Sequence, residues 1–209
     1  MTMDLYDVMR TTAAIREYED RDVPNDVLHR VLDGARFAPS GGNRQGWRVI
    51  VVRDRAVKRR LRDLYREPWQ AYIGKRDPGR DHRMRVMNRF VECLDDIPVI
   101  LTFWADMPTI EFTDRDLDRP SVVGGGSVWP LVQNVALACR REGLGTAITT
   151  LLVRQEPEVR ALLQAPDEFG LVCVMTLGYP RRFASRLRRK PVSEFAYLER
   201  FGGEPVSPH

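Results

Sequence analysis

The stretch 38–47 of this 209-residue chain gathers groups suited to binding a small polar molecule. It reads APSGGNRQGW and follows a segment with the apolar spacing of a helix. Pro39 and the glycine pair 41–42 end that helix, and the apolar run 48–52 predicts a strand. The loop between them offers the Ser40 hydroxyl, the Asn43 amide and several backbone N–H groups, which can grip a flat polar heterocycle. An ordinary helix-to-strand turn has the same composition, so the loop alone leaves both interpretations open.

Three other segments carry groups that match such a ligand. Arg16 places a cation near the N-terminus, and the segment 145–151 (GTAITTL) offers hydroxyl groups and backbone N–H groups to a ring edge. The run 181–190 is the densest basic segment. Two or three of its cations suffice for one phosphate, although a solvated charged face is the ordinary alternative.

The sequence lacks the common motifs of nucleotide-binding loops, serine hydrolases and metal sites. The sequence has no G-x-G-x-x-G after a strand, no G-x-x-x-x-G-K-[ST] and no G-x-S-x-G. The three histidines (29, 82 and 209) are isolated, and the three cysteines (93, 139 and 173) have no metal-ligand spacing. An enzyme with so few catalytic side chains of its own would take its chemistry from a cofactor.

The length allows one large domain or two small ones, and with no obvious linker in the sequence we expect a single domain over residues 1–209. The formal net charge is +4. No run approaches the roughly 20 apolar residues of a membrane span, and the N-terminus has no pattern of a signal peptide. With three reduced cysteines, we expect a cytoplasmic protein without membrane partners. A nucleic-acid binder using residues 181–190 is a minor alternative because acids are mixed with bases along most of the chain.

The apolar periodicity predicts a chain of alternating helices and strands. We expect helices at 4–10, 24–37, 54–66, 81–95, 127–142 and 157–165, and strands at 48–52, 99–104, 145–151 and 169–177. Residues 67–80, with Trp69 and Tyr72, and residues 106–126 are expected to be long loops. The helix 127–142 is apolar nearly all round, which predicts a central position or a subunit interface.

Four motifs in this order resemble the FMN-dependent nitroreductase family, over residues 10–194. They are APSGGNRQ at 38–45 followed by Trp47, SVWPLVQN at 127–134, GLGT at 143–146, and LGYP at 177–180 followed by RRKP at 188–191. The resemblance implies an α+β fold with a central, mostly antiparallel sheet flanked by helices. It also implies an intertwined homodimer with two FMN sites at its interface.

The resemblance implies the following site residues. The loop residues Pro39, Ser40, Gly41 and Asn43 would contact the flavin of the partner subunit. Arg16 matches the family's N-terminal cation, and the helix 127–142 matches its long interface helix. The segment beside flavin N5 and O4 corresponds to Thr149, Thr150 and Leu151, and the phosphate-binding basic pair corresponds to Arg188 and Arg189.

This sequence departs from the family pattern at the phosphate. Relatives usually carry an arginine three or four positions before the N-terminal cation, where this chain has Ala13 and Thr12. Arg10 lies further away. Weaker FMN binding is one expected consequence, and compensation by Arg186 or Lys190 is the other.

Two further departures concern the ring. Relatives often have proline after the glutamine of the loop motif, where this chain has Gly46. Some relatives place Glu-Gly beside N5, where this chain has Thr150 and Leu151. A backbone N–H is then the expected donor to N5.

The resemblance implies an oxidoreductase in which hydride passes from NAD(P)H to FMN and then to a nitroaromatic, a quinone or a similar electrophile. Two alternatives stay open. One is a protein that binds FMN without catalysis, with residues 67–80 and 106–126 as a lid. The other is a specialised oxidoreductase for flavin breakdown, dehalogenation or dehydrogenation.

Overall fold

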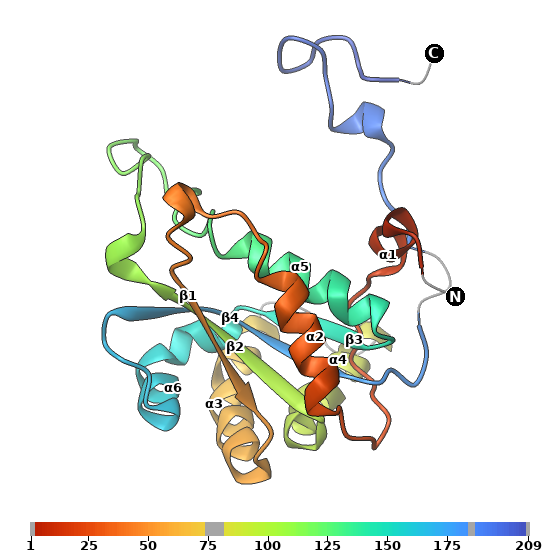
Figure 1. The fold of residues 1–209 in the computed structure, drawn as a ribbon, viewed down its shortest axis with the longest axis vertical. Helices are drawn as coiled ribbons and strands as arrows, with labels where there is room; N and C mark the ends of the chain where they lie inside the picture. The colour runs from red at the N-terminus through yellow and green to blue at the C-terminus, as the bar shows by residue number, and fades with distance from the viewer. Residues whose placement is uncertain (1–2, 74–81, 184–186, 208–209) are drawn as a thin grey trace.

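The computed structural model describes residues 3–73, 82–183 and 187–207, and is built around a four-stranded antiparallel sheet (Figure 1). The strand order is β1 (Trp47–Val52), β2 (Val99–Asp106), β4 (Phe169–Gly178) and β3 (Gly145–Thr149). Every pairing between neighbouring strands is antiparallel. The expected antiparallel sheet with flanking helices is therefore confirmed.

Helices cover both faces of the sheet (Figure 1). One face packs against α2 (Asn25–Ala35) and α5 (Trp129–Arg141). The other packs against α3 (Arg55–Ile73), α4 (His82–Glu92) and α6 (Glu156–Leu163). The helix α1 (Leu5–Thr11) contacts the α5 layer.

The central strand β2 shows why the sheet is buried on both sides. Its odd residues, such as Leu101 and Phe103, join the α2 and α5 core, whereas Ile100 and Trp104 join the core under α3. Successive side chains of a strand point to opposite faces. The continuous apolar run at 99–104 is thus explained by two hydrophobic layers.

The helix α3 is longer than predicted, and the expected loop at 67–80 is wrong for residues 67–73. Leu61, Tyr65 and Trp69 recur at four-residue spacing and all are buried, so the apolar stripe continues past Pro68. A proline inside a helix costs about 3 kcal/mol. Burial of Trp69 (4% exposed) and its hydrogen bond to Asn88 Oδ1 at 2.9 Å offset this cost. Residues 74–80 lie outside the described residues.

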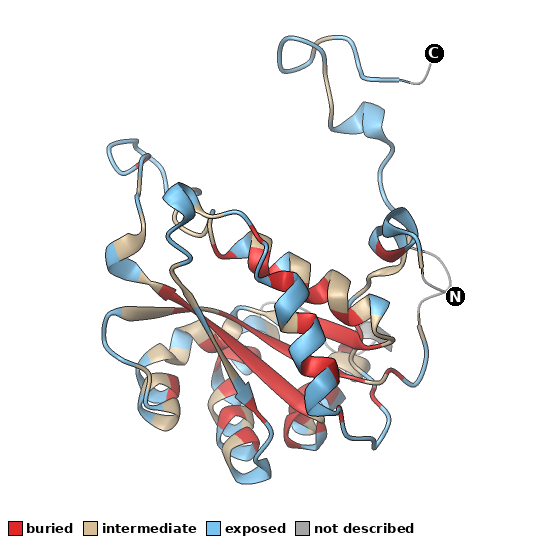
Figure 2. Ribbon diagram, viewed as in Figure 1, coloured by how far each residue is buried: buried red, intermediate tan, exposed pale blue. Residues whose placement is uncertain are grey.

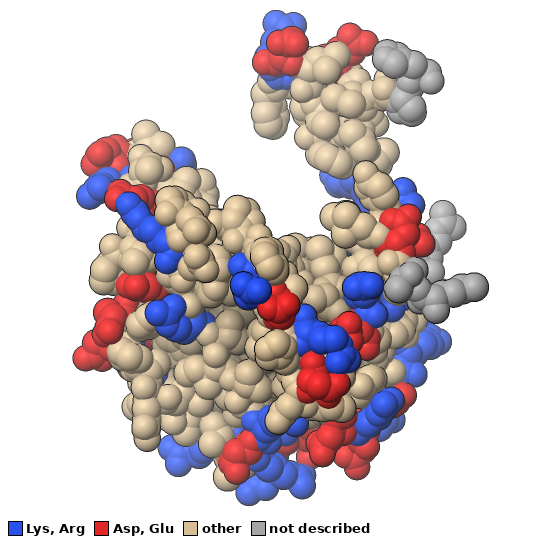
Figure 3. Space-filling model, viewed as in Figure 1, with Lys and Arg blue, Asp and Glu red and all other residues tan. Residues whose placement is uncertain are grey.

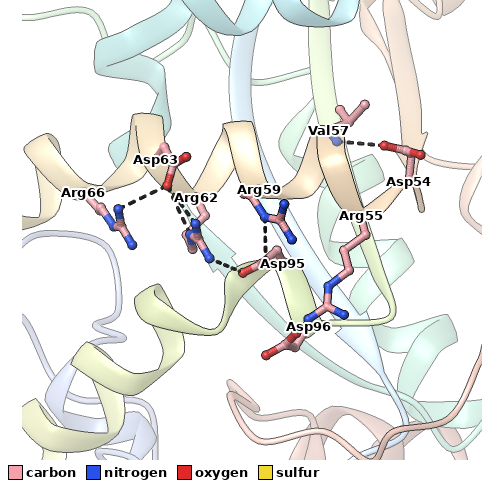
Figure 4. Close-up of polar contacts among 9 residues, drawn as sticks. All are labelled: Asp54, Arg55, Val57, Arg59, Arg62, Asp63, Arg66, Asp95 and Asp96. Carbon is pink, nitrogen blue, oxygen red and sulfur yellow. Dashed lines mark hydrogen bonds and ion pairs between the residues drawn. The ribbon is translucent and has the colours of Figure 1, made fainter.

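An ion-pair network holds the start of α3 against the segment after α4 (Figure 4). Asp95, with a side chain 6% exposed, accepts from Arg62 at 2.8 Å and lies 3.6 Å from Arg59. Burial raises the pKa of Asp95, but its own backbone N–H and Arg62 outweigh that effect and hold the pKa below its usual range. Asp54 caps the helix by accepting from Val57 N at 2.8 Å.

The ends of two other elements differ from the sequence predictions. Helix α5 begins at Trp129, and Ser127 does not cap it, because its hydroxyl accepts from Gly41 N at 3.1 Å instead. The extended segment predicted at 145–151 ends at Thr149, and a 3-10 helix, η4 (Leu151–Gln155), follows.

Helix α5 is buried only on its inner side. Its core residues include Val132, Val135 and Cys139, whereas Trp129 is 41% exposed and Gln133 is exposed. Within one chain the outer side of this helix is therefore uncovered. A position in a subunit interface stays a prediction.

The last described segment, 187–207, runs as an arm away from the body of the molecule (Figure 1). Figure 2 shows that most of this arm is exposed. Lysine and arginine are interspersed with aspartate and glutamate over the face shown in Figure 3. Across the described ranges, no helix is long and apolar enough to cross a membrane.

Candidate functional site

The loop at 40–45 is a turn held by hydrogen bonds between its own residues. The Ser40 hydroxyl accepts from Gln45 N at 3.0 Å, and the Ser40 carbonyl accepts from Asn43 N at 2.9 Å. Gly42, Asn43 and Gln45 all have positive φ, of 59°, 53° and 51°. Glycine and asparagine tolerate this left-handed conformation best, which explains the local sequence. Pro39, Gly41 and Asn43 are exposed on this turn.

Contacts from two other segments anchor the loop. The Ser127 hydroxyl, just before α5, accepts from Gly41 N, and the Thr109 carbonyl accepts from Arg44 at 3.2 Å. A Cβ added at Gly46 would lie 2.2 Å from Thr109 Oγ1. A residue larger than glycine at position 46 would therefore have to displace the Thr109 side chain.

The neighbouring loop at 106–126 is ordered around Asp114. Its buried carboxylate accepts from Val122 N at 2.9 Å, from the Ser121 hydroxyl at 2.7 Å and from Arg119 at 2.7 Å. The Val122 N–H, the Ser121 hydroxyl and Arg119 lower the pKa of Asp114 to about 2. Parts of both loops line a cleft of about 190 Å³.

Arg16 lies on the opposite edge of the sheet. Ile15 N donates to Thr146 O at 2.7 Å, which fixes this segment beside β3. The Arg16 guanidinium lies 5.9 Å from the Phe90 ring and lines a cavity of about 150 Å³ together with Phe90 and Arg181. Among the described residues, no carboxylate oxygen lies within 4.0 Å of the Arg16 guanidinium, although Glu17 and Asp96 also line this cavity.

The end of β3 is joined to α3 by a pair of hydroxyl groups. Tyr65 OH and Thr149 Oγ1 are 2.8 Å apart, and Thr149 Oγ1 also accepts from Leu151 N at 3.3 Å. Burial raises the pKa of Tyr65, while the Thr149 hydrogen bond and the charge of Arg16 oppose that rise. Thr150 is exposed. Tyr65 and Thr149 are in direct contact, and Arg16 lies close enough for its charge to act on Tyr65; the three residues are called the Arg16 cluster below.

The basic pair lies on the arm. Both side chains are exposed, and Arg189 donates to its neighbour's carbonyl, Arg188 O, at 2.8 Å. Lys190, a possible compensating cation, is paired with Glu194 at 3.3 Å. Arg186 and the side chain of His82 lie outside the described residues.

The structure does not bring all the predicted residues together. The loop 40–45 leads into β1, and Arg16 and Thr149 lie at β3, so they occupy the two edges of the sheet. Three strand spacings of about 4.8 Å separate those edges by about 14 Å. In one chain the loop therefore cannot contact the same ring edge as the Arg16 cluster.

The comparisons with known proteins decide the family. The model of the Nitroreductase family matches residues 9–179. The chain belongs to the nitroreductase family. The matched residues include the motifs at 38–47, 127–134 and 143–146, whereas RRKP at 188–191 lies beyond them.

The relatives of this nitroreductase-family chain include two kinds of named activity. Iodotyrosine deiodinase 1 of Mus musculus is 26% identical over 198 residues, covering 92% of this chain and 68% of the mouse protein. An NADH dehydrogenase of Thermus thermophilus is 25% identical over 205 residues, covering 86% of this chain and 88% of that protein.

Solved structures share the fold. Oxidised iodotyrosine deiodinase bound to FMN and 3-iodo-L-tyrosine superposes with a TM-score of 0.74 at 23% identity, covering 95% of this chain and all of that chain. A BluB-like flavoprotein from Clostridium difficile has a TM-score of 0.70 at 22% identity, with the same coverage.

Sequence reasoning missed two contributors to this nitroreductase-family site. Tyr65 was not among the predicted site residues, and only its contact with Thr149 reveals it. Ser127 was expected only as the first residue of the helix 127–142, whereas its hydroxyl anchors the loop. Arg10, the nearest arginine before Thr12, lies 5.6 Å from the Tyr6 ring.

Proposed function

We propose that this nitroreductase-family chain is an FMN-dependent oxidoreductase, and that it works as a homodimer. The observation that carries the proposal is the division of ligand-binding groups between two edges of one sheet. A two-fold-related partner can bring its loop 40–45 to the Arg16 cluster of the first subunit. Each flavin would then be held by both chains.

The residues present fit FMN. A phosphorylated flat ring needs cations and hydrogen-bond donors, and the Arg16 edge supplies both. Arg16 has no carboxylate partner among the described residues, and Thr150, just after the end of β3, is exposed. The partner's contribution would be the exposed amide of its own Asn43. Arg188 and Arg189 would bind the phosphate.

When bound, FMN supplies hydride chemistry at N5, accepting from NAD(P)H and donating to an electrophilic substrate in alternate half-reactions. The protein would hold Arg16 where negative charge develops on the reduced ring, since a preorganised cation stabilises such charge. Tyr65 and Thr149 would fix the position of the segment beside the ring. The buried aromatic groups of α3 and α4 would exclude water from this edge.

A visible spectrum and anaerobic stopped-flow mixing test the proposal. We expect the purified protein to show oxidised-flavin absorbance, and that absorbance to bleach on mixing with NADH or NADPH. Bound FMN that stays oxidised with both nucleotides would instead favour a protein that stores FMN. A protein that binds no FMN would contradict the proposal altogether.

The deiodinase relatives favour one second candidate, a reductive dehalogenase of small aromatic molecules. Such an enzyme would replace a carbon–halogen bond with carbon–hydrogen, using two electrons and a proton. The direct measurement is iodide release from 3-iodo-L-tyrosine by the dithionite-reduced holoprotein. If nitroaromatics or quinones reoxidise the reduced holoprotein but no iodide is released, the dehalogenase is excluded and the first candidate remains.

A further inference from the structure

Arg140, in the last turn of α5, is an arginine held in place without a carboxylate. Its Nε donates to Thr11 Oγ1 at 3.0 Å, and its guanidinium lies 3.9 Å from the centre of the Phe183 ring. The side chain is partly buried. These contacts fix the planar group and leave its remaining N–H donors available.

No acid neutralises this charge in the part of the chain that the structure describes. No carboxylate oxygen lies within 4.0 Å of the Arg140 guanidinium. Glu142, two residues further on, is paired with Arg30 at 3.0 Å instead. Burial lowers the pKa of Arg140 with no opposing charge. A partly desolvated cation in such surroundings favours an anionic ligand.

A structural role explains part of the arrangement. A cation near a helix C-terminus interacts favourably with the helix dipole, and a guanidinium over an aromatic ring is attracted to its face. Arg140 also links α1 to α5 through Thr11. None of these contacts needs the fork of N–H donors that arginine offers to a phosphate.

The position of Arg140 distinguishes it from an ordinary helix-end cation. It packs with Thr12, Ala13 and Gly145 around a narrow cleft that has no room for a water molecule, so that a ligand would meet the guanidinium from its solvent side. The residues at 12 and 13 are those where the family resemblance expects an arginine and this sequence has none. Arg140 thus reaches the same place from α5.

The second source of charge is within reach of this cleft. Phe183, on which Arg140 stacks, precedes the basic pair 188–189 by only five residues. Five extended residues span at most about 18 Å. The basic pair therefore lies within about 18 Å, along the chain, of the ring on which Arg140 stacks.

We propose that Arg140 binds the phosphate of FMN, replacing the N-terminal arginine that this chain lacks. The inference rests on the proposed function, because it names one residue of the same flavin site. The group that is bound is a phosphomonoester. The Arg140 guanidinium on α5 would bind it from one side and the cations of the arm from the other.

Comparing FMN with riboflavin isolates the phosphate. Dissociation constants would be measured by flavin fluorescence quenching for the native protein, for Arg140→Met and for Arg141→Met. Arg141 is the matched control, since it is an exposed arginine next in the same helix. We expect Arg140→Met to weaken FMN binding about 10- to 100-fold, as for loss of a charge-assisted hydrogen bond. Riboflavin affinity should stay within about twofold of the native value, and Arg141→Met should change neither affinity.

A second variant guards against a purely structural effect. Adding Ala13→Arg to Arg140→Met returns a cation to the cleft from the N-terminal side and should restore most of the FMN affinity. Equal weakening of FMN and riboflavin, or no change in either, would overturn the role of Arg140 while leaving the flavin site itself intact. Failure of the native protein to bind either flavin would overturn the proposed function and this inference together.

Discussion

At the scale of single residues, the backbone conformation decides how the candidate loop can be tested. Asn43 has a φ of 53°, so alanine there would add a left-handed strain of about 1–2 kcal/mol to the loss of the amide. Glycine removes the amide without that strain. Asn43→Gly is therefore the cleaner substitution.

We expect Asn43→Gly to weaken FMN binding by about 2- to 10-fold, the net value of one hydrogen bond. Its melting temperature should stay close to that of the native protein. Gln164→Gly is the matched control, because Gln164 has the same φ of 53° at the end of α6. If both variants bind FMN as the native protein does, the loop is only a turn.

At the scale of elements, the second half of α3 depends on tertiary contacts that local rules do not include. Pro68 signals a helix end, yet the helix continues to Ile73. The buried Trp69 side chain, next to Pro68, donates a hydrogen bond to Asn88 on α4. The pair α3 and α4 is therefore stabilised as a unit, next to the Arg16 cavity to which Phe90 of α4 contributes.

Asn88→Ala tests that unit. The buried Trp69 Nε1–H would lose its acceptor, which costs about 1–3 kcal/mol in the free energy of unfolding. For a chain of this size that lowers the melting temperature by about 2–12 °C. Gln70→Ala, an exposed position on the same helix, should change it little. Equal melting temperatures for the two variants would mean that this hydrogen bond does not hold α3 to α4.

At the scale of the whole molecule, the arm is the feature that one chain leaves unexplained. Phe201 is 99% exposed and Phe195 is 65% exposed on a segment that stands away from the body (Figure 2). Large apolar groups gathered on an exposed surface indicate an interaction site. A second copy of the chain is the partner that the proposed function requires.

We expect a chain that ends at Lys190 to be monomeric, or to dimerise far more weakly, in sedimentation equilibrium. It should also lose FMN binding, because the loop and the Arg16 cluster of one chain lie on opposite sheet edges. In the full chain, Phe201→Ser should weaken dimerisation and Arg200→Ser should not. A truncated chain that remains a tight dimer with full flavin content would refute this role of the arm.

The amino-acid sequence by itself determined the family through contiguous motifs, and the individual helices and strands through local periodicity. The antiparallel sheet and its flanking helices were implied by the family resemblance. The stretch 38–45 and the apolar strand 99–104 are examples. The interpretations as a single domain and as a cytoplasmic protein stay predictions.

Only the tertiary structure decided what lies next to what. It extended α3 past Pro68 and joined Tyr65 to Thr149. It also placed Arg140 beside Ala13, where the family resemblance expects an arginine. It also separated the loop 40–45 from Arg16 by the width of the sheet. These relations join residues far apart along the chain, and packing that buries apolar groups and satisfies polar ones is decided by the folded chain as a whole.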